Sequence, residues 1–249
     1  LELIEYIFGE VKSVCWVDFD NDSDLDLSLT EYYGSFFLFE NIGDLEFIDV
    51  TDSALLTNES CHNFGHSWVD INQDGFLDVY PNRYFLGQDC TDYGSENLLF
   101  VNNGDNTYTE RASEYGISDG NKESFQSSFY DYDKDGLLDL HIINDRIYEN
   151  SLYRNTGLGY FEDVSESAGV NLVQDAMTNT IFDFNLDGFH DIYFTNTWQN
   201  GNHLLAYNPE TQSYEDHFPN SGAESYSFNW GAIPIDCDND KNIDLAVSG

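Results

Sequence analysis

Short runs of apolar, β-branched and aromatic residues recur along the chain, separated by clusters of Asp, Asn and Gly. Runs of about four to eight such residues between turn-forming residues predict β-strands. In the first group the runs occupy residues 13–17, 25–29, 35–40 and 45–50. The last run of each group alternates apolar and polar residues, which is typical of an outer strand with one face in water. The pattern therefore predicts groups of four antiparallel strands.

The connection between the first two strands of each group carries oxygen side chains at positions 1, 3, 5 and 9, most often with glycine at position 6. Alternating oxygen ligands in a tight turn can point at one centre, and glycine allows the sharp bend. Oxygen ligands with several formal charges suit calcium, which takes roughly 6–8 of them. The predicted ligands are Asp18, Asp20, Asp22, Asp26, Asp70, Asn72, Asp74, Asp78, Asp131, Asp133, Asp135, Asp139, Asp183, Asn185, Asp187, Asp191, Asp236, Asp238, Asp240 and Asp244.

These segments follow one another at a nearly fixed step. Their first residues are 18, 70, 131, 183 and 236, which gives intervals of 52, 61, 52 and 53 residues. A fixed step of one supersecondary unit indicates a repeat architecture, and four antiparallel strands in each unit predict the blades of a β-propeller. We expect residues 1–249 to form a single propeller domain or a segment of one. The expected repeats are residues 11–57, 62–117, 124–170, 176–222 and a partial 229–249, with residues 1–7 as the outer strand of a preceding or split blade.

An EF-hand loop also opens with alternating Asp residues and a glycine. It requires a bidentate Glu at position 12 and helices on both sides. Position 12 is never Glu here, and strand-forming residues flank each segment; the five residues at that position are Leu29, Pro81, Ile142, Phe194 and Val247. The sequence therefore excludes EF-hands.

The loop between two strands, followed by an Asn-x-Gly turn and a Phe-x-Asp-Val strand, resembles the FG-GAP/VCBS repeats of integrin α-subunit propellers and many secreted bacterial proteins. The resemblance implies an all-β fold, a β-propeller of four-stranded antiparallel blades with a calcium loop between the first two strands of each blade. It also implies up to five Ca²⁺ ions and a secreted, extracellular or cell-surface location. Ser23 and Lys241 depart from the pattern at the glycine position, and Asn72 and Asn185 replace a charged ligand. We expect weaker calcium binding in those loops.

The charge balance excludes some partners. The chain has 47 acidic and 8 basic residues, a formal net charge of −39. Nucleic acid is a poor partner, because phosphate contacts need clustered Lys and Arg. No apolar run approaches the roughly 18 residues of a membrane span, so membrane insertion is not expected. An apolar content of 41% indicates a globular chain despite this charge.

The number of blades stays open. The chain opens on Leu1 rather than Met, so we expect a processed or excerpted segment. It could be part of a six- or seven-bladed ring, a closed five-bladed ring, or a chain whose open edges a neighbouring chain completes.

Few residues outside the loops are candidates for catalysis, disulfide formation or ligand binding. We expect no enzymatic activity, because carboxylates that saturate calcium cannot shuttle protons and the six His residues are scattered. Cys61 and Cys90 flank the first two strands of the longest repeat, on the side opposite its loop, and predict a disulfide. The insertion between them predicts a ligand-binding surface formed by Arg83, Tyr84, Phe85 and Tyr93.

Three functions follow from these expectations. The first is a non-enzymatic binding or adhesion module for an extracellular protein or glycan. The second is a carbohydrate-active propeller, either a lectin or a polysaccharide lyase. The third is a structural subunit that self-associates through open blade edges into an extracellular assembly or filament.

Overall fold

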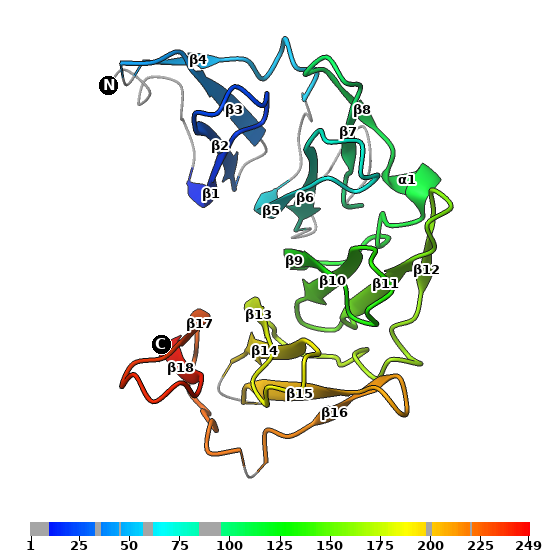
Figure 1. Ribbon diagram of the computed structural model, residues 1–249, viewed down its shortest axis with the longest axis vertical. Coiled ribbons are helices and arrows are strands. Elements are labelled where there is room, and N and C mark those ends of the chain that lie inside the picture. The colour runs from blue at the N-terminus through cyan, green and yellow to red at the C-terminus, as the bar shows by residue number, and fades with distance from the viewer. Residues whose placement is uncertain are drawn as a thin grey trace. The chain divides into compact units, whose positions relative to one another are not determined.

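The computed structural model describes residues 10–32, 36–44, 46–56, 62–84, 96–197, 201–219 and 221–249. The chain divides into two compact units, Leu1–Ser124 and Phe125–Gly249. Each unit is built from antiparallel sheets in which neighbouring strands are consecutive in sequence. The all-β, four-stranded architecture expected from the hydrophobic pattern is confirmed (Figure 1). The expected outer strand at residues 1–7 lies outside the described residues.

The first unit contains two four-stranded sheets, ordered β1-β2-β3-β4 and β5-β6-β7-β8. A short helix, α1 (Ala112–Tyr115), follows the second sheet. The strands are β1 (Val11–Val17), β2 (Asp26–Glu31), β3 (Phe36–Asn41), β4 (Phe47–Asp49), β5 (Asn63–Val69), β6 (Asp78–Arg83), β7 (Phe100–Asn102) and β8 (Tyr108–Glu110).

The second unit repeats this arrangement, with sheets ordered β12-β11-β10-β9 and β13-β14-β15-β16 and a two-stranded sheet β17-β18. Its first strand begins with the last residue of the first unit. The strands are β9 (Ser124–Tyr130), β10 (Asp139–Asn144), β11 (Ser151–Asn155), β12 (Phe161–Asp163), β13 (Thr178–Phe182), β14 (Asp191–Thr195), β15 (His203–Asn208), β16 (Ser213–Asp216), β17 (Gly231–Ile235) and β18 (Asp244–Ser248).

The fourth strand of each full sheet is shorter than the alternating pattern predicts. It ends at an acidic residue whose carboxylate accepts the backbone N–H two residues further on. These pairs are Asp49 with Thr51, Glu110 with Ala112, Asp163 with Ser165, and Asp216 with Phe218. Such a side-chain-to-backbone bond mimics a turn and competes with the strand ladder.

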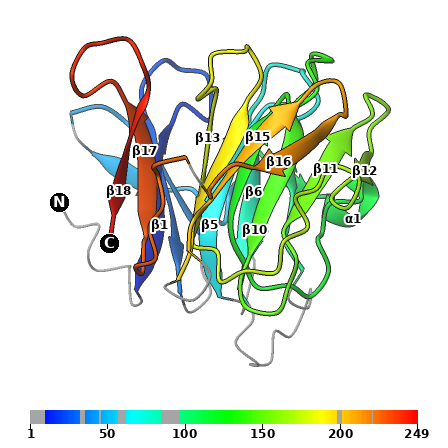
Figure 2. The same cartoon turned by 90° about the horizontal axis from the view of Figure 1, so that it is seen from below.

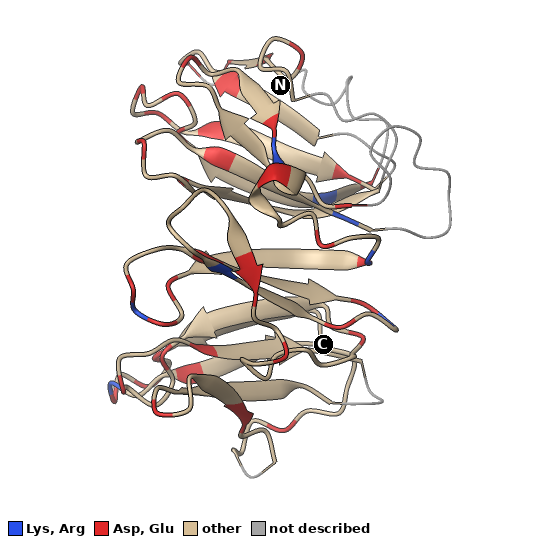
Figure 3. Cartoon of the chain, turned by 90° about the vertical axis from the view of Figure 1, so that its right-hand side faces the viewer, with Lys and Arg blue, Asp and Glu red and all other residues tan. Residues whose placement is uncertain are grey.

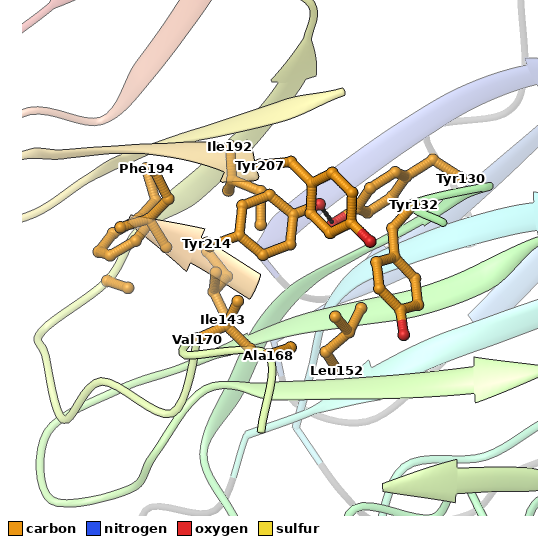
Figure 4. Close-up of a cluster of buried hydrophobic side chains, with 12 residues drawn as sticks. Tyr130, Tyr132, Ile143, Leu152, Ala168, Val170, Ile192, Phe194, Tyr207 and Tyr214 are labelled. Atoms are coloured by element: carbon orange, nitrogen blue, oxygen red, sulfur yellow. Dashed lines mark hydrogen bonds between the residues drawn. The ribbon is translucent and has the colours of Figure 1, made fainter. Parts of the chain in front are cut away.

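The cores lie between consecutive sheets of a unit. In the second unit, Tyr130 and Leu152 of one sheet pack with Ile192 and Tyr214 of the next, all nearly fully buried. The hydroxyls of Tyr130 and Tyr214 share a hydrogen bond of 2.9 Å inside this cluster (Figure 4). The first unit has a corresponding cluster in which Phe36 and Leu38 of one sheet meet Val79 and Phe100 of the next. Burying these side chains stabilises the fold by about 25 cal/mol per Å² of apolar surface removed from water, and it holds each sheet against its neighbour.

Polar contacts also join consecutive sheets, at the same position of the repeat. The Ser28 hydroxyl bonds His66 Nε2 at 2.8 Å, and His141 Nδ1 bonds Asn179 Nδ2 at 3.0 Å. Both pairs are separated by 38 residues, which places a second-strand residue against the first strand of the following sheet. Sheet stacking in the two units therefore follows one register.

Candidate metal centres

All five loops between the first two strands of a sheet share one backbone conformation. Position 4 has a left-handed φ between 58° and 65° in every loop. Position 6 is also left-handed, at 88° to 92° for the three glycines, 78° for Ser23 and 73° for Lys241. A side chain in this region costs roughly 1–2 kcal/mol. Ser23 and Lys241, which stand where the other loops have glycine, therefore strain their loops without changing the backbone path.

The carboxylate at position 1 organises each loop. In the third loop, Asp131 Oδ1 accepts the N–H of Asp135 at 3.1 Å and Oδ2 accepts the N–H of Gly136 at 3.0 Å. Asp133 Oδ1 also accepts the Asp135 N–H, and Asp135 Oδ1 accepts the N–H of Leu137. The other four loops repeat these four bonds at distances of 2.8–3.2 Å. The nine-residue segment therefore positions its own carboxylates.

The Asp at position 9 anchors the loop to the sheet. Asp139, with no exposed surface, accepts the Tyr132 N–H on Oδ2 at 3.1 Å and the Asn155 N–H on Oδ1 at 2.8 Å. Asn155 lies on the third strand, so one carboxylate ties three segments of the sheet together. The equivalents in the other complete sheets, Asp26, Asp78 and Asp191, make the same two bonds.

Burial raises the pKa of each of these four carboxyls. The pKa of Asp139 rises to about 7, and those of Asp26, Asp78 and Asp191 rise to about 6. Desolvation is the largest cause, and neighbouring carboxylates add to it against the two backbone hydrogen bonds. A negative charge at position 9 therefore destabilises the folded state unless a cation lies close to it.

The loops differ in how they balance like charges. Where position 3 is Asp, three carboxylates each offer an oxygen within 4.8 Å of the others. Where position 3 is Asn, its amide donates to the carboxylate at position 5, from Asn72 to Asp74 at 2.8 Å and from Asn185 to Asp187 at 3.0 Å. The three carboxylate groups are Asp18, Asp20 and Asp22; Asp131, Asp133 and Asp139; and Asp236, Asp238 and Asp244.

This donor set fits a hard cation. All ligands are oxygens, and each bonded carboxylate oxygen keeps a second lone pair for a metal. Figure 3 shows acidic residues in the loops between the strands, with few basic residues near them. In Figure 2 the fifth loop joins β17 and β18 at the top of the view. The fifth loop, where the sequence departs from the pattern, keeps all four position-1, -3 and -5 bonds.

Two of the four residues predicted to bind a ligand are buried. Arg83 and Tyr84 are only 1% and 5% exposed, so neither can stack on a ligand without a rearrangement. Phe85 and Tyr93 lie outside the described residues, as do Cys61 and Cys90. The ligand surface therefore depends on undescribed residues, and the disulfide stays a prediction. Cys15 and Cys237 are free thiols.

Sequence reasoning missed a set of buried asparagines at the strand ends opposite the loops. Asn97, Asn150 and Asn202 each accept, on Oδ1, the N–H of the residue that ends the second strand or follows it directly. The Nδ2 of Asn97 donates to Ser124 at 2.9 Å. The position that corresponds to Ser124 in the next repeat is Ala176, and Asn150 Nδ2 is buried without a hydrogen-bond partner among the residues that the structure describes.

The FG-GAP-like repeat family matches the chain at residues 18–80 and 131–194, slightly more than half of its length. The chain belongs to this family. Each matched segment of this FG-GAP-like protein starts at the first Asp of a loop and ends in the second strand of the following sheet.

Among solved structures, the FG-GAP-like chain is similar to an Agrocybe aegerita lectin that specifically recognises non-reducing terminal N-acetylglucosamine. The TM-score is 0.53 at 15% sequence identity, over 95% of this chain and 60% of the lectin chain. The chain thus spans less than two thirds of that lectin, and the likeness concerns the fold. No curated protein sequence matches the chain. None of the helices in the described part of the chain has the length and apolar character that a membrane crossing requires.

Proposed function

We propose that this protein is a calcium-stabilised β-propeller module that binds an extracellular ligand and has no enzymatic activity of its own. The observation that carries the proposal is the common geometry of the five loops. Backbone N–H groups hold the carboxylates of each loop in one arrangement, in spite of their mutual repulsion. A cation in each loop would balance this charge and stiffen the link between the first two strands.

The structural role of calcium follows from the position-9 carboxylate. It bonds the loop on one side and the third strand on the other. An ion on this carboxylate stabilises the folded sheet by mass action, because the unfolded chain does not hold the ligands together. Loops with four carboxylates should bind calcium more tightly than the Asn72 and Asn185 loops, which have three.

A non-enzymatic role agrees with the environment of the candidate catalytic groups. The loop carboxylates are engaged by backbone donors. The Ser28–His66 pair resembles a nucleophile and its base, but Ser28 has no exposed surface and also accepts a hydrogen bond from Trp68 Nε1. A substrate could not reach that hydroxyl. Both observations support binding rather than catalysis.

For the ligand we propose a glycan. The support is the similarity in fold to a lectin and the net charge of −39, which disfavours polyanionic partners. An extracellular location is proposed with it, since calcium is plentiful there and the family resemblance points the same way.

The test is thermal unfolding of the chain after dialysis against EDTA and after return of calcium, with magnesium as the control ion. We expect a large rise in unfolding temperature with calcium and a small one with magnesium, which prefers a tighter octahedral site with retained waters. Identical curves in calcium and EDTA would refute calcium stabilisation. Calcium-dependent growth of large particles in light scattering would favour an assembly subunit instead.

A further inference from the structure

The second unit contains an open groove of about 440 Å³, the β13–β17 groove. Its size falls within the range of small-ligand sites, roughly 300–1,000 Å³. Four strands contribute to it, and the residues that matter here are Gln126 of β9, Thr178 and Thr180 of β13, Ile233 of β17, and Val247 and Ser248 of β18.

The groove lies away from the metal loops. Thr178 is the first residue of β13 and Ser248 the last of β18. The loops of these sheets begin after the last residues of β13 and β17. The groove is therefore built on the opposite ends of the same strands, and a change in its lining need not disturb a loop.

None of the described residues that line the groove has a charged side chain. This is unusual in a chain in which 22% of residues are charged. Its polar groups are hydroxyls and side-chain amides, and its apolar groups include Ile233, 60% exposed, and Val247, 37% exposed. An uncharged surface with hydroxyls, amides and aliphatic patches matches a neutral ligand that is itself rich in hydroxyl and C–H groups.

Two polar groups of the groove have fixed directions. Gln126 Oε1 accepts the N–H of Asn179 at 3.2 Å, which orients the amide and leaves its NH₂ without a hydrogen-bond partner among the described residues. Thr180 Oγ1 donates its proton to the carbonyl of Ala232 at 2.7 Å. Towards a ligand, this hydroxyl can therefore act only as a hydrogen-bond acceptor. A donor and an acceptor held in this way suit the vicinal hydroxyls of a sugar ring.

Further hydrogen bonds hold Asn179, the residue that orients Gln126, in place. Asn179 is buried, and its side chain bonds both Ser128 Oγ and His141 Nδ1 at 3.0 Å. The residue that fixes Gln126 is thus itself fixed by a second residue of β9 and by His141 of β10. Such a second layer of hydrogen bonds preorganises a binding site.

Exposed aromatic rings lie along the segment that leads into the groove. Tyr226, Phe228 and Trp230 are 64%, 39% and 57% exposed. The alternate residues Ser225, Ser227 and Asn229 bond one another and, through Asn229 Nδ2, Asn202. The Trp230 N–H donates to the Ser248 carbonyl at 3.0 Å, which puts its backbone at the margin of the groove.

We propose that the β13–β17 groove binds a neutral sugar residue, with the Gln126 amide as donor, the Thr180 hydroxyl as acceptor, and Ile233 and Val247 against the C–H face of the ring. The exposed aromatic rings would stack on further residues of the same glycan. This inference rests on the proposed binding function and gives it a site and a ligand class.

The experiment is calorimetric titration of the calcium-loaded chain with N-acetylglucosamine, galactose and glucuronic acid, alone and as short oligosaccharides. We expect at least one neutral sugar to bind in the millimolar range and glucuronic acid to bind far more weakly. Gln126→Glu keeps the size of the side chain but removes the donor, and should weaken binding about tenfold. Gln212→Glu makes the same change in an exposed turn and should leave binding unchanged.

Thr180→Val, which removes the proposed acceptor and should also weaken binding, supplies an independent test should Gln126→Glu fold poorly, and each variant is compared only after its calcium-dependent unfolding matches the wild type. Absence of neutral sugar binding with calcium stabilisation intact would overturn the groove assignment and leave the calcium proposal standing. Equal binding by wild type and Gln126→Glu, or by glucuronic acid and the neutral sugars, would also overturn it.

Discussion

Replacing Asp139 by Asn separates calcium binding from ordinary hydrogen bonding at position 9. Asp139 accepts two backbone N–H groups, and an amide can accept only one of them. A lost hydrogen bond to a charged group is worth about 1.5–3 kcal/mol. Burial raises the pKa of Asp139 to about 7, so the neutral amide relieves part of the desolvation penalty. In EDTA we therefore expect a net loss of about 1 kcal/mol.

In calcium the loss should be larger, because the variant would also weaken the calcium binding proposed for the third loop. At a calcium concentration of about 100 times the dissociation constant, one site stabilises the fold by about 2.7 kcal/mol. The variant should then lose about 3–4 kcal/mol, which lowers the unfolding temperature by roughly 6–16 °C. The assay is unfolding followed by circular dichroism, with denaturant for the free energy and heat for the temperature, each in calcium and in EDTA.

The matched control is Asp163→Asn in the same sheet. Asp163 is exposed at the end of β12, far in sequence from the loop ligands, and among the described residues its carboxylate accepts hydrogen bonds from Ser165 alone. Its loss of stability should be the same in calcium and in EDTA. Equal losses for Asp139→Asn in the two conditions, or a calcium-dependent loss for Asp163→Asn, would refute the role given to position 9.

Three further predictions concern the repeats. Ser23→Gly should stabilise the chain by about 1 kcal/mol, because Ser23 has a φ of 78° that glycine adopts without strain; an unchanged urea midpoint would contradict the strain argument. Ala176→Ser should add about 1 kcal/mol by giving Asn150 Nδ2 the partner that Asn97 has in Ser124; destabilisation in the same assay would show that the site has no room for the hydroxyl. Burial lowers the pKa of His141 to about 3, so the unfolded state binds the extra proton below pH 6.5, and stability present above that pH is lost as the pH falls toward 3. At pH 5 this loss amounts to about 2 kcal/mol, and His141→Gln should reduce the fall in unfolding free energy between pH 6.5 and pH 5 by that amount; an equal fall in the variant and the wild type would contradict it.

The sequence by itself determined the loops and most of the strands, because both depend on interactions over short stretches of chain. The carboxylates at positions 1, 3 and 5 of a loop are held by N–H groups within five residues, and a strand is recognised from the composition of about six consecutive residues. A step of 52 to 61 residues then repeats the unit. Local signals failed at the strand ends, where Asp163 diverts the chain into a turn before its apolar pattern ends.

Tertiary structure decided the features that join distant segments. Arg83 and Tyr84 are residue types that are common in binding loops, yet both are buried in the folded protein. The contact between Ser28 and His66 depends on how one sheet stacks on the next. The β13–β17 groove draws its lining from residues 126–248, which no local pattern connects. A loop can be predicted from its own residues, because the hydrogen bonds of its carboxylates at positions 1, 3 and 5 close within it, whereas a groove exists only where separate sheets meet.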